Sequence, residues 1–248
     1  MTTRIAASEA EWKRLASSAA AREAFAAWRA RGGNAAAIAL PAPVAHLTFD
    51  TGGAGGRPDK QFDGDEGEEH PEVRTFARTD AFSLIVRLQP TEAQDRAVIV
   101  HQSRAWTDAG SRGFELTLDH GRPFFGLIHF WPGNAVAVRA KAPLPLGRWT
   151  TVTVTYDGSS RAAGLAIYAD GRPLDTEVVR DRLYKDITYS KARGDLLDRA
   201  PLAIGARFRD SGFKNGRIDD LRIFDVALTR AEVATLASAG TASTTASL

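Results

Sequence analysis

The sequence predicts an all-β protein whose strands form an antiparallel sandwich, on three observations. Apolar and polar side chains alternate along 149–156, which is the period of a half-buried strand. Turn residues at 157–160 and at 170–171 close this segment into a hairpin with a second short strand. Segments of similar composition recur along most of the chain at the short, even spacing that is typical of sandwiches.

Taken in order, these segments form one large domain with a helix before it and a helix at its end. Residues 8–31 are rich in Ala, Glu, Lys and Arg and predict a helix, with Ser8 and Glu11 as its capping box. After the last strand, Thr229 and Glu232 form a second capping box and predict a short helix. The predicted strands are 44–50, 82–88, 97–103, 113–118, 123–130, 135–140, the hairpin within 148–173, 201–208 and 217–224.

The predicted domain organisation has three parts. Residues 1–42 form an N-terminal helix and connector, residues 43–239 form the sandwich, and residues 240–248 form a Thr-, Ser- and Ala-rich tail that we expect to be disordered. Between 175 and 199 the strand pattern gives way to mixed charge, which predicts a long loop. A loop of this length in a compact domain is usually functional or mobile.

Composition excludes several function classes. The 248 residues include 32 basic and 30 acidic ones, for a net charge of +2, and the basic residues are scattered, so we expect no nucleic-acid partner. The chain has no Cys, which excludes disulfides and thiolate metal sites. No apolar run approaches the roughly 20 residues of a membrane span, and no signal-peptide pattern follows Met1.

Three predicted loops combine aromatic and polar side chains, as sugar-binding sites do. The candidate ligand-binding residues are Trp106, Asp108 and Arg112 in the first loop, His129, Trp131 and Asn134 in the second, and Arg207 and Arg209 in the third. An alternative remains open for each of them. The Trp side chains would then fill the core, and the Arg side chains would form internal salt bridges with Asp108, Glu115 or Asp210.

Three stretches carry a family resemblance: RWTTVTVTYDG at 148–158, LAIYADG at 165–171 and GRIDDLRIFDVALTRAEVATL at 216–236. They resemble the laminin-G-like, concanavalin-A-like superfamily over about residues 43–237. The resemblance implies an antiparallel jelly-roll β-sandwich. Because that fold is shared by lectins, glycan-binding modules, adhesion domains and glycoside hydrolases, it does not by itself imply one function.

A narrower resemblance involves 110–136, 156–165 and 205–216. These stretches are similar to a laminin-G-like segment of large bacterial multidomain proteins of unassigned function, which often also bind c-type haem. The present chain has no Cys and therefore no haem attachment site. The resemblance implies an extracytoplasmic location, periplasmic or at the cell surface, for the parent protein.

The superfamily resemblance also implies a structural calcium ion. In lectins and glucanases of the superfamily a calcium often joins the start of the chain to an Asp of the last strand, and Asp219 matches that Asp. Asp50, Asp63 and the backbone near Gly64 would complete a shell of oxygen ligands. The alternative is that the acidic run 62–69 is a solvated loop.

Catalysis is the weakest of the candidate activities. Glu115, Thr117 and Asp119 share one face of a predicted strand, and glucanases of the superfamily place their catalytic carboxylates at similar spacing. A retaining glycosidase needs carboxyl groups about 5–5.5 Å apart. Strand residues four apart are separated by about 13 Å along the backbone. We therefore predict a protein that is not an enzyme.

The sequence favours a non-catalytic carbohydrate-recognition module, lectin-like, with calcium in a structural role. The first alternative is a structural or protein-interaction module within a larger multidomain bacterial protein, whose partner is a neighbouring domain. The second alternative is a glycoside hydrolase.

Overall fold

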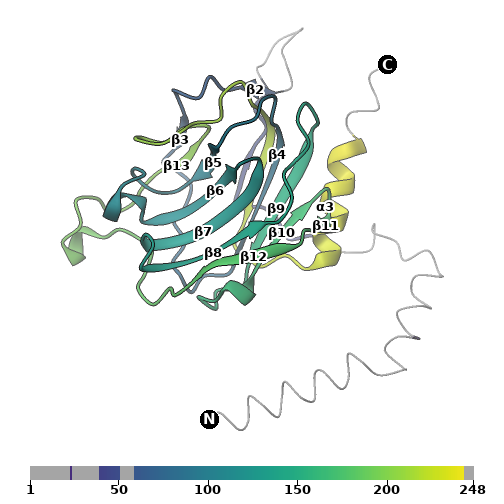
Figure 1. Ribbon diagram of the computed structural model, residues 1–248. Helices are drawn as coiled ribbons and strands as arrows, with labels where there is room; N and C mark the ends of the chain where they lie inside the picture. The colour runs from purple at the N-terminus through teal and green to yellow at the C-terminus, as the bar shows by residue number, and fades with distance from the viewer. Residues whose placement is uncertain (1–22, 24–38, 51–58, 243–248) are drawn as a thin grey trace. The chain divides into compact units, whose positions relative to one another are not determined.

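The computed structural model describes residues 23, 39–50 and 59–242 (Figure 1). The chain divides into two compact units, Met1–Ala39 and Leu40–Leu248, and both sheets belong to the second unit. The predicted helix over 8–31 lies, apart from Glu23, outside the described residues, as does the part 243–248 of the predicted tail.

Two antiparallel sheets form a sandwich, which confirms the predicted fold class (Figure 1). We name them sheet A and sheet B. In sheet A the neighbouring strands are β1 (Ala45–Leu47), β14 (Arg217–Phe224), β4 (Phe82–Gln89), β9 (Thr150–Tyr156), β10 (Leu165–Ala169) and β11 (Arg172–Pro173), with β2 (Lys60–Gln61) also pairing with β14. In sheet B they are β12 (Thr176–Asp181), β8 (Asn134–Ala140), β7 (Arg122–Phe130), β6 (Gly113–Asp119), β5 (Arg96–His101), β13 (Leu202–Ile204) and β3 (Glu68–His70).

The predicted strands are present, and four further strands were missed. Three of the four are the short β2, β3 and β11. The fourth, β12, lies inside the segment 175–199, so the prediction of one long loop there was wrong for its first part. The strand β12 pairs with β8 alone and lies at the edge of the sheet, where Val178 is 63% exposed. It therefore lacks the alternation of apolar and polar residues by which the other strands are recognised.

The core fills the space between the two sheets. Val152, Val154 and Tyr156 of β9 all face it, as their alternation predicts. Phe82 of sheet A packs against Phe125 of sheet B with ring centroids 6.1 Å apart. Such aromatic pairs add about 0.5–1.5 kcal/mol each beyond the area that they bury, so the pairing of the sheets is strongly fixed.

The helix α3 (Arg230–Ala242) covers the outer face of sheet A (Figure 1). The backbone N–H of Glu232 donates to Thr229 Oγ1 at 3.3 Å and the N–H of Thr229 donates to the Glu232 carboxylate at 2.7 Å, which confirms the capping box. Val233 and Leu236 pack against Ile85 of β4. None of the described helices is long and apolar enough to span a membrane.

Short 3₁₀ helices interrupt the connections: η2 (Asp108–Ser111), η3 (Ala162–Gly164) and η4 (Lys191–Arg193). The segment that contains η2 lies beside the turn 206–210. Ala105 and Phe208 form an isolated bridge, and Trp106 N–H donates to the Phe208 carbonyl at 3.1 Å. Glu115 and Thr117 of β6 point away from the core and are nevertheless fully buried. We infer from this burial that the two segments cover part of the outer face of sheet B.

Candidate functional site

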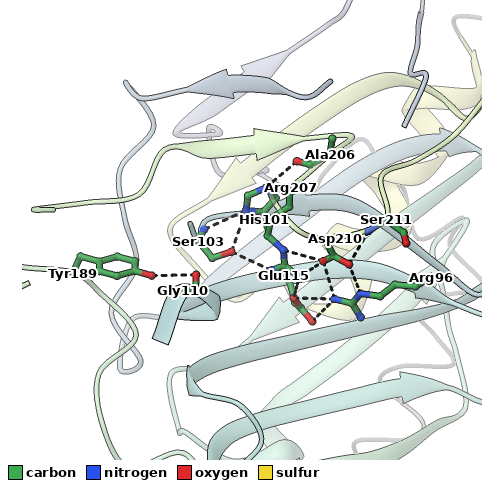
Figure 2. Close-up of polar contacts among 10 residues, drawn as sticks. All are labelled: Arg96, His101, Ser103, Gly110, Glu115, Tyr189, Ala206, Arg207, Asp210 and Ser211. Carbon is green, nitrogen blue, oxygen red and sulfur yellow. Dashed lines mark hydrogen bonds and ion pairs between the residues drawn. The ribbon is translucent and has the colours of Figure 1, made fainter. Parts of the chain in front are cut away.

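Four charged side chains form a buried cluster on the outer face of sheet B (Figure 2). Arg207 contributes Nη2, which lies 2.6 Å from Glu115 Oε2 and 2.5 Å from Asp210 Oδ2. Arg96 contributes Nε, 2.8 Å from Asp210 Oδ1, and Nη2, 3.3 Å from the Glu115 carboxylate. The Arg207 and Glu115 side chains are fully buried, so these charges are tolerated only because two cations face two anions.

The cluster holds Asp210 and Arg96 in their charged forms. Burial alone would raise the pKa of Asp210, but hydrogen bonds and charge from Arg96 and Arg207 outweigh it and hold the pKa below its ordinary value. Burial would lower the pKa of Arg96, and the charges of Glu115 and Asp210 raise it instead. The ion pair between Asp210 and Arg96 therefore stays charged and anchors the turn 206–210 to sheet B.

His101 lies against the same cluster (Figure 2). Its Nε2 is 3.0 Å from the Ala206 carbonyl and its Nδ1 is 3.1 Å from Ser103 Oγ. Burial, together with the Arg207 charge, lowers the pKa of His101 to about 3, so the ring is neutral near pH 7. Since a carbonyl can only accept, Nε2 carries the proton and Nδ1 accepts a hydrogen bond.

A large hollow of about 660 Å³ lies beside the cluster. Its lining brings together parts of the chain that are far apart in sequence, including Asp65, Glu69, His101, Arg104, Phe208 and Arg209. Phe208 is 69% exposed, although aromatic side chains of this size are usually buried. Its charged neighbours Asp65, Glu69, Arg104 and Arg209 are all exposed, and none has an ion-pair partner among the described residues.

A small hollow of about 200 Å³ is lined by Trp106, Thr107, Ser111 and Trp131. The two indole rings are tilted by 46° with centroids 6.1 Å apart. The Trp106 ring contacts two guanidinium groups of the buried cluster, those of Arg96 at 4.1 Å and Arg207 at 5.0 Å. Arg207 also lines the large hollow, so the two hollows are neighbours.

The sequence of this chain matches the family model of the concanavalin A-like lectin/glucanases superfamily over residues 62–234. The chain belongs to this superfamily. No curated protein matches the sequence.

Solved structures with the same superfamily fold are distant in sequence. The CBM40 of the Ruminococcus gnavus IT-sialidase, bound to alpha2,3 sialyllactose, aligns with a TM-score of 0.58 at 11% identity over 79% of this chain and 99% of that one. The binding domain of botulinum neurotoxin serotype G aligns at 0.53 and 13% identity, over 82% and 46% of the two chains. The NanB sialidase from Streptococcus pneumoniae aligns at 0.55 and 13%, over 79% and 28%. This chain therefore spans less than half of the last two, and the similarity shows the fold alone.

The structure distributes the predicted ligand-binding residues over three places. Arg207 and Arg209 line the large hollow, and Trp106 and Trp131 line the small one. Asp108 belongs to η2, and its side chain lies outside the described part of the chain. Arg207 forms internal salt bridges with Glu115 and Asp210, which is the alternative role predicted for the Arg side chains.

Arg112, His129 and Asn134 contact a different part of the chain, the segment 182–199. Arg112 Nη1 forms hydrogen bonds of 2.8 and 2.9 Å with the two carboxylate oxygens of Asp195. Asn134 Oδ1 accepts hydrogen bonds from the backbone N–H groups of residues 184 and 185, and His129 Nδ1 lies 2.6 Å from the carbonyl of residue 186. Burial lowers the pKa of His129, so its ring is neutral. These three residues hold the segment in place and do not line either hollow.

The predicted calcium ligands have other partners. Asp219 forms an ion pair with Arg87, although burial, the larger effect, raises the pKa of its carboxyl group. Asp63 Oδ1 accepts hydrogen bonds of 2.8 and 3.0 Å from the backbone N–H groups of residues 65 and 66, as in a local turn. Gly64 lies close to the backbone of Lys214.

Asp63 and Asp219 thus already have partners within the protein. Among the described residues, which include Asp50, Asp63 and Asp219, no three acidic or His side chains lie close enough together to hold a metal ion. Calcium ligation by these residues stays a prediction.

Glu115 and Asp119, the carboxylates weighed for catalysis, are each neutralised by arginine. Glu115 lies inside the buried cluster, and Asp119 pairs with Arg139 and, at 3.7 Å, with Arg122. A retaining glycosidase of the superfamily needs two carboxyl groups that act on one bond. The separate ion pairs give no support to that use.

The predicted ligand-binding residues do not include several residues of the large hollow: Asp65, Glu69, His101, Ser103, Arg104 and Phe208, although Phe208 belongs to the third predicted loop. Phe208 stands between two predicted residues, Arg207 and Arg209, and that adjacency was an available signal. Glu69 and His101 come together only because β13 pairs with both β3 and β5. No local pattern carries that information, because it depends on the order of strands in the sheet.

Proposed function

We propose that this chain is a non-catalytic carbohydrate-binding module and that the large hollow on sheet B is its binding site. The observation that carries the proposal is an exposed Phe208 ring in a hollow that is also lined by four charged side chains without an ion-pair partner in the described part of the chain. An aromatic ring covers the apolar face of a sugar, and charged side chains form strong hydrogen bonds with its hydroxyl groups. The volume of 660 Å³ falls within the range of about 300–1,000 Å³ that is typical of small-molecule sites.

The buried cluster prepares this surface before a ligand arrives. Arg207 and Asp210 are fixed at the two ends of the turn, and the Asp210 N–H donates to the Arg207 carbonyl at 3.1 Å. Phe208 and Arg209 lie between them, with the Arg209 guanidinium 5.2 Å from the Phe208 ring. A ligand therefore loses little affinity to ordering of the site.

The charge of the hollow is balanced. Arg104 and Arg209 line the hollow together with Asp65 and Glu69, while the buried cluster contributes no net charge. A balanced set of donors and acceptors suits the hydroxyl groups of a sugar, which both donate and accept. The CBM40 that shares the fold was solved with a bound sialyllactose, which supports a sugar as the ligand class.

The proposal is tested on a glycan array with the purified chain and with Phe208→Ala. We expect saturable binding of a subset of glycans and a loss of about tenfold or more in affinity, ~1.4 kcal/mol, for the variant. Val178→Ala is the matched control, because Val178 is also on sheet B and is 63% exposed, but does not line the hollow. Equal affinities for all three proteins would contradict the proposed site.

A protein-interaction role is the second candidate. Leu196 and Tyr184, in the segment 182–199, are 77% and 59% exposed and would be available for contact with a protein partner. An array without any binding, together with retention of a neighbouring domain of the parent protein by the wild-type chain but not by Leu196→Asp, would favour this role.

A further inference from the structure

The small hollow has a construction of its own. Trp131 packs its ring edge against Phe124 of β7 with centroids 6.0 Å apart, and the Arg180 guanidinium of β12 lies 5.3 Å from the same ring. Trp106 is held by Arg96 and Arg207. Both indoles are therefore fixed by contacts with sheet B and with arginines, and both remain half-exposed.

The two indoles share one feature that matters for binding: both line the same open hollow. A Trp side chain that only fills the core is largely buried, whereas these two leave part of their rings in the wall of an open hollow. The hollow cannot be explained as packing between the sheets, because the core lies on the other face of sheet B.

The lining determines which ligand fits. Besides the two indoles it consists of Thr107 and Ser111, so the described lining contains hydroxyl groups and no charged side chain. The large hollow, in contrast, is lined by both Arg and acidic residues. An uncharged ring with an apolar face and hydroxyl groups at its edge matches the small hollow. Its volume of 200 Å³ lies below the range of about 300–1,000 Å³ for drug-sized ligands, which suits a single ring.

We propose that the Trp106–Trp131 hollow is a second subsite, which binds one uncharged sugar ring by stacking on the indoles. This inference rests on the proposed carbohydrate-binding function but uses different residues. Arg207 connects the two sites, because its guanidinium contacts the Trp106 ring and also lines the large hollow. A glycan with a neutral residue next to a more polar one would engage both.

The test follows the indole N–H resonances of the chain by NMR while lactose, maltose or cellobiose is added. The five Trp resonances are assigned with single Trp→Phe variants. We expect saturable shifts of the Trp106 and Trp131 resonances with at least one disaccharide, and loss of the Trp106 shift in Trp131→Ala. Thr107→Val, which replaces one hydroxyl with a methyl group, should weaken binding without disturbing the fold.

Trp149 is the matched control. It lies on sheet A, and like Trp106 it contacts two guanidinium groups, those of Arg87 at 4.9 Å and Arg217 at 5.9 Å. Its resonance should not move, and Trp149→Ala should bind as the wild type does. An equal shift of Trp149 would reveal non-specific stacking and overturn the subsite.

The remaining outcomes separate this subsite from the large hollow. Array binding that Phe208→Ala abolishes, with no shift of Trp106 or Trp131 by any disaccharide, would overturn the subsite and leave the proposed function intact. Shifts that Trp131→Ala abolishes and Phe208→Ala does not alter would support the subsite even if the large hollow proves inactive. A response to N-acetyl-leucinamide but to none of the sugars would assign the hollow to a protein side chain and overturn the proposal.

Discussion

The substitution Glu115→Gln tests whether the buried cluster stabilises the fold as its geometry indicates. The side chain is fully buried and lies between Arg96 and Arg207. Glutamine has nearly the same shape, so the change removes one negative charge and replaces one acceptor oxygen with an NH2 donor that faces guanidinium donors. Two guanidinium groups would then face only the carboxylate of Asp210, and one positive charge would be left without a counter-charge in a buried place.

Removing one partner of a buried ion pair costs about 3–5 kcal/mol. For a domain of about 150–250 residues each kcal/mol shifts Tm by about 2–4 °C, so we expect Glu115→Gln to lower Tm by roughly 6–20 °C. The assay is thermal unfolding followed by circular dichroism, with guanidinium titration as a second measure of the free energy of unfolding.

The matched control is Glu177→Gln. Glu177 also pairs with an arginine of sheet B, Arg139, but its side chain is 43% exposed. Pairs of this kind contribute about 0–1 kcal/mol, so this variant should melt within about 4 °C of the wild type. If both variants have the same Tm, the reasoning about the buried cluster is refuted, because burial would then make no difference to the cost of losing a charge.

Three further predictions follow from the same structure. His101 has a pKa of about 3 in the fold against an ordinary value of 6.5, so as pH falls this side chain is protonated in the unfolded chain before it is protonated in the folded one. The free energy of unfolding should therefore fall as pH drops below 6.5, by up to about 1.4 kcal/mol per pH unit. Urea titrations between about pH 7 and about pH 4.5 measure this slope, and His101→Gln should flatten it. Arg112→Ala should release the segment that Asp195 anchors, so trypsin should cleave after the exposed Lys191 and Arg193 faster than in the wild type. The control is Arg148→Ala, whose arginine pairs with an acidic residue outside this segment, and its cleavage should be slower than that of Arg112→Ala. Because Asp219 already pairs with Arg87, we expect calcium and chelator to leave Tm unchanged, and a rise in Tm with calcium that Asp219→Asn abolishes would instead establish the metal site.

The sequence predicted those parts of the fold that repeat locally. The alternation of Val152, Val154 and Tyr156 identified β9 and its inner face, and the Thr229–Glu232 spacing identified the start of α3. Both depend on neighbours within a few residues. The strand β12 was missed because an exposed edge strand buries neither face regularly, so its sequence does not differ from that of a loop.

The candidate site was predicted less well, for a related reason. Residues on one short turn, such as Arg207 and Arg209, were correctly grouped because the chain itself keeps them together. Arg112 was placed with Trp106 on the same argument, yet its carboxylate partner is Asp195, 83 positions further along the chain. Which loops meet depends on strand order and on loop conformation, and a single sequence contains no local record of either.

In the turn 206–210, the residues that anchor the turn differ from the residues that it exposes. Arg207 and Asp210 are bound into the buried cluster, whereas Phe208 and Arg209 between them are exposed. Arg209 has a φ of 60°, which Asn or Gly would adopt at least as easily. Substitutions at Phe208 and Arg209 would alter the proposed binding surface while the anchoring ion pairs stay in place. Selection or design can therefore alter the proposed ligand specificity at these two positions without changing the sandwich.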